Sequence, residues 1–525
     1  MSEAETDEGH AEGAAAGAPG AAPARRPRIA AAVTAAVLFA GVAAVLARTT
    51  PWNPLPGHVP GGRVTPDPAL DFTPAEIARS RAFDSAVNPP AYTGLLVGLA
   101  LILVLGFTPL GARFIGWATA KPRRRPILST EDDPPHPPDR LRRRPSPPRG
   151  DDPPHPPDRL RRRPSPPRGG DPPHPPRRLR RRPLRIILAV LAVTTLLRVA
   201  GLPFDIWSES VLRRYGLSTQ SWPAWLVDQA KSLAVTWVIY TIALLLLYAL
   251  TRRFPRYWWT GAAVGGFVLV VFASFVYPLA VEPVFNRFHS LPAGPLRSDL
   301  LAMARRDGVP VEDVLVADAS RRTTSLNAYV SGFGSTRRIV LYDTLLKSPP
   351  AQVESIVGHE LGHAKRDDVL WGTLVGALGV AGALCLLYLL MTSPRLLRRA
   401  GLDPGVPGSG GTGPDARRGG GAADPRSVAL LLALVTAGTT LAAPVQNLVS
   451  RRIEARADAH ALDLTRDPST FVSMQHALSV RNISDLNPDT AEYLLWLTHP
   501  AGPDRIAMAR DWARLHHVQA PPPLR

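Results

Sequence analysis

The sequence of 525 residues predicts a mostly α-helical, polytopic membrane protein with about seven transmembrane helices and a small α+β domain. Seven apolar runs of 18–24 residues alternate with polar segments. A helix of about 20 apolar residues crosses the hydrocarbon core of a bilayer. The polar segment between the fifth and sixth runs shows the spacing of short helices and strands. The single cysteine, Cys385, excludes a disulfide-stabilised secreted domain.

The seven apolar runs are long enough to be membrane spans, and basic or aromatic residues flank several of them, as at a membrane–water interface. The first run exceeds the apolar core of about 7–15 residues in a signal peptide, so we interpret it as a span. Cys385 lies inside the sixth run and is expected in the apolar core. The runs are Ile29–Ala47, Tyr92–Leu110, Leu184–Leu202, Leu233–Leu250, Trp258–Tyr277, Val369–Thr392 and Val428–Val445.

A linker of low complexity interrupts the spans after the second one. It repeats the unit DDPPHPPDRLRRRPSPPRG, and residues 121–183 hold 19 Lys and Arg against 8 Asp and Glu, most of the net charge of +18. A unit so rich in proline has no apolar face to bury, so we expect an extended, disordered chain with solvated histidines at His136, His155 and His174. The repeats lack aromatic residues for stacking on bases, so no nucleic acid partner is expected.

These patterns divide the chain into spans, linkers and one polar domain that is built from two segments. The division is a disordered tail (1–28), the first two spans and their loop (29–120), the disordered Pro/Arg repeat linker (121–183), spans three to five (184–277), the first part of the polar domain (278–368), span six (369–392), a Gly-rich loop (393–427), span seven (428–445) and the second part of the domain with the C-terminal tail (446–525).

The first part of the polar domain combines helical and strand patterns. Leu296–Arg306 has helical spacing, whereas Val314–Ala317 and Arg338–Tyr342 are typical of strands. Pro350 opens a further helix, because proline is favoured in a first helical turn. The sequence therefore predicts an α+β domain beside the membrane spans.

The helix that Pro350 opens contains a His-Glu-x-x-His motif, with His359, Glu360 and His363 in its fixed positions. Side chains at i and i+4 share a helix face, so both imidazoles can bind one metal ion. Glu360 can take a proton from a metal-bound water without filling a ligand position. The motif predicts a zincin-like metallopeptidase domain with one Zn²⁺ per chain.

A catalytic zinc site uses three protein ligands and keeps one position open. No further histidine follows within six residues of His363, so the third ligand must come from elsewhere. Glu454 is the candidate, and Asp458 lies one turn further on the same helix face, where it can orient a ligating histidine. The alternative is a solvated glutamate flanked by arginines.

Five ordered sequence blocks resemble those of the type I CAAX prenyl protease family, and the resemblance covers most of the chain from His58 to His499. Besides HELGH and RIEARAD, they are LPFDIWSESVLRRYGLSTQSWPAWLVDQAK, EPVFNRFHSLPAGPLRSDL and SLNAYVSGFGSTRRIVLYDTLL. The resemblance implies a membrane-embedded zinc endopeptidase with seven spans. The repeat linker and the Gly-rich loop depart from the family pattern. The composition, rich in Ala, Arg and Pro and poor in Lys, is typical of a GC-rich bacterial genome, and bacteria generally lack prenylated CAAX proteins, so the prenylated substrate is not carried over.

The resemblance also implies roles for single residues. It implies zinc ligands at His359, His363 and Glu454, with Glu360 as the base. It implies that Asn327, in the block Asn327-Ala328-Tyr329, holds the substrate backbone, and that His499 and Arg505 face the reacting carbonyl. An oxyanion develops there during hydrolysis, and an imidazole and a guanidinium can stabilise it. Because Asn327, Ala328 and Tyr329 precede a strand, the edge of that strand can bind an extended substrate.

Two functions of different class follow from these observations. The first is a metalloprotease of the cell membrane, whose substrates are membrane-associated, lipid-modified or misfolded polypeptides. The second is a non-catalytic membrane sensor or receptor that keeps the fold, which retention of Glu360 disfavours. Membrane lipids are expected contacts of the spans and of the Arg triplets. On sidedness, the arginine-rich loops place the metal site outside the cytoplasm, whereas the resemblance implies the cytosolic side.

Overall fold

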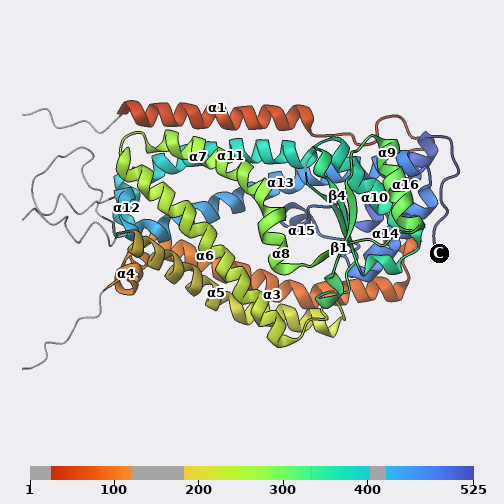
Figure 1. The fold of residues 1–525 in the computed structure, drawn as a ribbon, viewed down its shortest axis with the longest axis horizontal. Helices are drawn as coiled ribbons and strands as arrows, with labels where there is room; N and C mark the ends of the chain where they lie inside the picture. Colours follow the sequence, from red (N-terminus) through yellow and green to blue (C-terminus); the bar gives the residue numbers. More distant parts are fainter. Residues whose placement is uncertain (1–24, 121–181, 333, 403–420) are drawn as a thin grey trace, which may run out of the picture.

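The computed structural model describes residues 25–120, 182–332, 334–402 and 421–525. Seven of its helices are long and apolar enough to cross a membrane, and each contains one predicted span or all but the last few residues of it. They run along the long axis of the molecule (Figure 1). These helices are α1 (Arg25–Thr49), α3 (Pro74–Phe107), α5 (Arg182–Arg214), α6 (Trp222–Arg253), α7 (Trp258–Val276), α11 (Asp368–Met391) and α13 (Val428–Thr465).

Two helix boundaries differ from the prediction for local reasons. The second predicted span runs to Leu110, but α3 ends at Phe107, because Pro109 starts the separate helix α4 (Pro109–Ala118). The seventh predicted span ends at Val445, but α13 continues through the polar sequence to Thr465. A membrane helix therefore carries Glu454 and Asp458 directly into the α/β half of the molecule.

The predicted disordered tail and linker and most of the Gly-rich loop lie outside the described residues, namely in 1–24, 121–181 and 403–420. The disorder of the tail and the linker stays a prediction. The edges of these segments are helical where the structure describes them. Arg25–Arg28, assigned to the tail, form the first turn of α1, because Pro27 is tolerated there. Within the Gly-rich loop, Pro394–Arg399 form α12.

The α/β half is built on a four-stranded sheet of order β1-β2-β4-β3. β2 and β4 pair in parallel, and the other two pairs are antiparallel, so β3 is an edge strand. The predicted strands at Val314–Ala317 and Arg338–Tyr342 are confirmed to within one residue. The strands are β1 (Phe288–Ser290), β2 (Asp313–Ala317), β3 (Ala328–Ser331) and β4 (Arg338–Tyr342).

Short helices surround the sheet, and most begin with proline in their first turn, where its missing N–H costs nothing. The helices predicted at Leu296–Arg306 and from Pro350 are confirmed as α9 and α10. Figure 1 shows α9, α10, α14 and α16 at the sheet end of the molecule. The short helices of the α/β half and of its junction with the bundle are α2 (Pro68–Asp71), α8 (Glu282–Phe285), α9 (Pro295–Asp307), α10 (Pro350–Lys365), α14 (Pro468–Asn482), α15 (Thr490–Leu495) and α16 (Gly502–Leu515).

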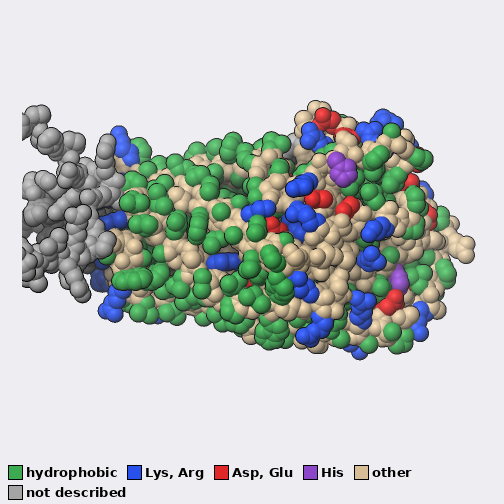
Figure 2. All heavy atoms as spheres, turned by 60° about the horizontal axis from the view of Figure 1, so that its bottom comes forward, with side chains coloured by type: hydrophobic (Ala, Val, Ile, Leu, Met, Phe, Trp, Pro, Cys, Tyr) green, Lys and Arg blue, Asp and Glu red, His purple; other side chains and the backbone are tan. Residues whose placement is uncertain are grey.

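The two halves have separate apolar cores. The bundle core includes Tyr248, Tyr388 and the buried Cys385, and the α/β core includes Ile339 and Trp512. On the face turned forward in Figure 2, hydrophobic side chains cover the bundle, and charged side chains gather over the α/β half. This division matches a bundle in lipid and an α/β half in water.

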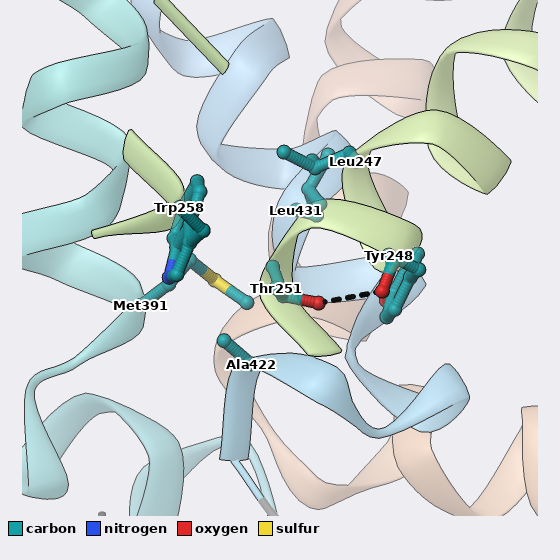
Figure 3. Close-up of a pocket in the computed structure, with 7 residues that line it drawn as sticks. All are labelled: Leu247, Tyr248, Thr251, Trp258, Met391, Ala422 and Leu431. Carbon is teal, nitrogen blue, oxygen red and sulfur yellow. Dashed lines mark hydrogen bonds between the residues drawn. The ribbon is translucent and has the colours of Figure 1, made fainter. Parts of the chain in front are cut away.

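A small cavity lies in the bundle at the end remote from the sheet, where Thr251 donates a hydrogen bond to the carbonyl of Tyr248 (Figure 3). Its volume of about 10 Å³ is at the lower limit for one water molecule. Its wall is otherwise apolar, including Trp258 and Met391. It is therefore a packing defect between spans rather than a binding site.

Candidate metal centre

Helix α10 presents the His-Glu-x-x-His motif to α13. Its opposite face packs into the α/β core through Val353, Val357 and Leu361, which are fully buried. Two glycines let α10 approach α13 closely. A Cβ on Gly362 would lie 3.0 Å from the side chain of His460, and one on Gly358 would lie 3.5 Å from the backbone of Ala461. The small residues of the motif therefore bring Glu454 within reach of both histidines.

Three ligand atoms converge between the two helices, from His359, His363 and Glu454, and all lie within 4.8 Å of one another. The two Nε2 atoms are 3.1 Å apart. Glu454 Oε2 is 3.1 Å from His359 Nε2, and Glu454 Oε1 is 3.6 Å from His363 Nε2. Ligands of a tetrahedral zinc ion lie about 3.3–3.6 Å apart, given zinc–ligand bonds of about 2.0–2.2 Å. The donor set therefore fits one such cation.

Each histidine has a carboxylate on its outer nitrogen. Asp458 Oδ1 is 2.8 Å from His359 Nδ1, and Asp368 Oδ2 is 2.9 Å from His363 Nδ1. A carboxylate in this position accepts a hydrogen bond from Nδ1–H and so keeps the proton on Nδ1, which leaves the lone pair of Nε2 pointing at the metal position. Sequence reasoning expected the first of these carboxylates and missed the second.

Each carboxylate is held in turn by an arginine. Arg505 Nε donates to Asp458 Oδ2 at 2.8 Å, and Arg456 donates to Asp368 Oδ1. The side chain of Arg505 is 10% exposed, and Arg505 is not among the residues that line the cavity at the site. The resemblance placed Arg505 against the reacting carbonyl. In the structure its guanidinium lies behind His359 instead, because the buried carboxylate of Asp458 binds it.

The surroundings of α10 shift the ionisation of its side chains. Burial raises the pKa of the Glu360 carboxyl above its usual value, although the two neighbouring imidazoles oppose this. Burial alone would lower the pKa of His363, but hydrogen bonds to Asp368 and Glu454 raise it to about 10. The carboxylates thus attract positive charge to the centre, which a metal ion supplies when it displaces the proton.

A cavity of about 410 Å³ opens beside the three ligand atoms. The edge strand β3 forms one wall, and the corner between α10 and α11 forms another. All three residues predicted to bind substrate line it, as do Glu360 and His499. The lining residues are Asn327, Ala328, Tyr329, Val330, Gly332, Arg337, His359, Glu360, His363, Ala364, Asp367, Asp368, Val369, Leu370, Glu454 and His499.

His499 reaches the centre from the loop between α15 and α16. Its Nε2 is 3.3 Å from Glu454 Oε2, and its Nδ1 is 2.9 Å from the hydroxyl of Thr498. The side chain is 58% exposed, on the open side of the cavity. The structure therefore brings His499 together with the motif, as the resemblance implied. His460, two residues after Asp458, bonds Asp307 and is not part of the metal centre.

Two residues at the site had no clear signal in the sequence. Asp368 follows His363 by five residues, beyond the end of α10, and reaches back because Asp367 adopts a left-handed conformation with φ of 54°. Arg456 is one of several arginines around Glu454, and only the rotation of α13 selects it.

Comparisons with known proteins agree with this geometry. The model described as "Peptidase family M48" matches residues 290–513, and "CAAX prenyl protease N-terminal, five membrane helices" matches residues 180–287. An uncharacterized metalloprotease, YhfN of Bacillus subtilis, is 30% identical over 61% of this chain and 72% of its own length. A CAAX prenyl protease 1 homolog of Oryza sativa subsp. japonica is 27% identical over 60% of this chain and 70% of its own.

A solved structure shares the fold. The crystal structure of S. mikatae Ste24p aligns with a TM-score of 0.64 over 92% of this chain and 99% of that chain, at 19% identity. The shared fold includes the helical bundle as well as the α/β half, because the alignment spans nearly all of both chains.

Proposed function

As a member of peptidase family M48, the chain is a multi-span membrane metalloendopeptidase, and we propose that His359, His363 and Glu454 hold one zinc ion for it. The observation that carries this proposal is the convergence of these three ligand atoms beside Glu360 in an open cavity. When bound, zinc supplies a Lewis acid that polarises the peptide carbonyl and lowers the pKa of water.

Glu360 is the proposed general base. It lines the cavity without contributing a ligand atom to the cluster. Burial raises the pKa of the Glu360 carboxyl toward neutral pH. General acid–base catalysis is most effective when the pKa of the catalytic group lies near the working pH. Glu360 takes the proton of the attacking water and returns it to the leaving amine.

The edge strand β3 is the proposed substrate platform. Its partner β4 covers one edge, and the other edge faces the cavity. An extended polypeptide can add to that edge through backbone hydrogen bonds, with little dependence on side chains. Asn327, just before the strand, offers an acceptor and two donors to the substrate backbone, although its Oδ1 now accepts from Ala328 N.

His499 is the proposed donor to the oxyanion. Its imidazole lies over the cavity on the side of Glu454 and is exposed enough to turn toward a bound carbonyl. Arg505 acts only through Asp458, as a positioning residue, because its guanidinium does not reach the cavity.

The proposed substrates are polypeptides in or at the cell membrane, with or without a lipid modification. Val369 and Leu370 line the cavity and also begin the membrane helix α11, so the site lies within a turn of a span. We propose that segments 278–368 and 446–525 form one peptidase domain. The printed names of several relatives include CAAX prenyl protease, which makes prenylated chains one substrate class to test. Nucleic acid is not a proposed partner.

The alternative is a sensor that keeps the fold without catalysis. Such a protein needs no general base, whereas Glu360 is retained and lines the cavity. Purified protein in detergent should contain one zinc per chain and cleave unstructured peptides until a chelator removes the metal. Glu360→Gln should keep the zinc and lose cleavage, since the change spares the ligands. Full cleavage by this variant would contradict the mechanism, and zinc binding without any cleavage by the wild type would favour the sensor.

A further inference from the structure

The cavity holds one further cationic group besides the imidazoles of the metal centre. Arg337 lines it together with Gly332, and no other Lys or Arg of the described residues does. In the β3–β4 ladder the last pair is Ser331 with Arg338. Arg337 therefore lies just beyond the end of the edge strand on which a substrate would be laid.

The guanidinium of Arg337 is largely buried but sparsely bonded. Its side chain is 12% exposed, and in the described part of the chain only Asp367 accepts a hydrogen bond from it, through Nη2. A guanidinium has five N–H donors, and no nitrogen of Arg337 is among the buried, unpaired atoms of the described residues, so its unbonded donors are open to water. Several donors of Arg337 thus remain available to a ligand in the cavity.

The present partner of Arg337 is weakly held. The side chain of Asp367 is 48% exposed, so its ion pair with Arg337 is largely screened by water. Asp367 occupies the N-cap position of α11, but its side chain makes no capping bond there. Its left-handed backbone, with φ of 54°, directs the corner into the cavity wall. A second carboxylate can therefore share or replace this contact.

Two of the acidic groups nearer the metal centre are already engaged, and the third, Glu360, is the proposed general base. Asp368 bonds His363 and Arg456, and Glu454 bonds both histidines. Val369 and Leu370 add apolar wall beside Asp367. A charged group brought by the substrate into this end of the cavity is complementary only if it is negative, and Arg binds carboxylates bidentately.

We propose that Arg337 forms a carboxylate-binding subsite and determines substrate specificity. It binds the side chain of an Asp or Glu, or the terminal carboxylate of the chain, on one side of the scissile bond. Strand residues rise about 3.3 Å each, so a group roughly two to four residues from the bond reaches the end of β3. This inference rests on the proposed peptidase function and names the substrate feature that the same cavity selects.

The test uses unstructured peptides of uncharged sequence with one cleavage site. Glu and Gln are compared at each of four positions on either side of the bond, and a free C-terminus is compared with an amide. The wild type should prefer the carboxylate at one position by about 10-fold or more in kcat/KM, carried mainly by KM, as for a charge-assisted hydrogen bond. Preference for an internal Glu shows that the subsite binds a side-chain carboxylate, and preference for the free C-terminus shows that it binds the terminal carboxylate.

Variants separate this subsite from a structural ion pair. Arg337→Gln should reduce the preference to about one, and Arg337→Lys should keep part of it. Arg338→Gln is the matched control and should keep the full preference, because Arg338 is exposed, pairs with Glu312 and lies outside the cavity. Asp367→Asn should increase the preference, since it removes the competing carboxylate, whereas loss of a merely structural pair would leave it unchanged or lower it.

Binding of the same peptides to Glu360→Gln protein, measured by fluorescence anisotropy, tests the subsite without cleavage. Glu peptides should bind this protein about 10-fold more tightly than Gln peptides. Equal binding and cleavage of all carboxylate and neutral pairs would overturn the inference while leaving the peptidase intact. A preference that survives Arg337→Gln would overturn it as well. Carboxylate-selective binding without any cleavage by the wild type would support the subsite and contradict the proposed function.

Discussion

Each of the two histidines in the proposed metal centre bonds an aspartate that is held by an arginine, but the two aspartate–arginine pairs differ in their surroundings. At His359, Asp458 is fully buried and Arg505 is 10% exposed. At His363, Asp368 is 14% exposed and Arg456 is 25% exposed. The first support joins α10, α13 and α16 deep in the α/β half, whereas the second lies at the cavity wall, where α11 begins.

The buried pair that supports His359 is part of the packed interior of the α/β half, whereas the pair that supports His363 lies partly in water at the cavity wall. A buried charge pair cannot lose one member without a large penalty, because the remaining charge has no water. A partly exposed pair can, because water replaces the lost partner. The support of His359 should therefore matter for stability and metal binding together, and the support of His363 mainly for metal binding.

The largest effect is expected for Asp458→Asn. It leaves the guanidinium of Arg505 buried without its counter-charge, which should cost about 3–5 kcal/mol of unfolding free energy. Zinc affinity should fall about 100-fold, since His359 loses its charged support. Thermal unfolding of metal-free protein and competition with a chelator measure the two quantities. Stability close to the wild type would show that this pair is not the structural anchor inferred from its burial.

Arg505→Met should rank second and separates two roles. Arg505→Met should cost about 1–3 kcal/mol of stability, less than Asp458→Asn, because the buried Asp458 keeps its hydrogen bond to His359, and zinc affinity should fall about 10-fold. A residue facing the reacting carbonyl would instead lower kcat with zinc affinity and stability unchanged. Parallel measurement of kcat, chelator competition and melting temperature decides between them.

Asp368→Asn makes the same chemical change at the second support. Zinc affinity should fall about 10-fold, while the unfolding free energy of metal-free protein should change by less than about 1 kcal/mol, since the group is partly solvated. Visible absorption of the Co²⁺-substituted protein should shift, because the orientation of His363 changes. A stability loss equal to that of Asp458→Asn would break the contrast between the two supports.

The sequence predicts the first support more completely than the second, for a physical reason. Glu454 and Asp458 are one helical turn apart, so their shared face follows from periodicity alone. The strand at Arg338–Tyr342 was likewise predictable, because local apolar residues determine it. Asp368 depends on a left-handed residue between two helices, and Arg337 on where a hairpin ends, which no local pattern encodes.

Arg505 shows what a family resemblance alone cannot predict. A family resemblance can assign a residue to a site, but it does not resolve which side of a ligand that residue occupies. In the structure, Arg505 on α16 binds the buried Asp458 of α13, and the measurements on Arg505→Met test whether this contact is its role. The seven spans needed no such information, since length and hydropathy suffice to predict them.

The smallest effect is expected for Arg456→Gln, which tests how far the second support extends. Arg456 holds Asp368 Oδ1, but its side chain is 25% exposed, so water can take over part of its role. Zinc affinity should fall about threefold or less, and the unfolding free energy should change by less than about 1 kcal/mol. Arg452→Gln, a change at an exposed position one turn earlier on α13, is the matched control and should alter neither quantity. If Arg456→Gln weakened zinc binding as much as Arg505→Met, the two arginines would be equivalent. Burial would then not be what distinguishes the supports of the two histidines.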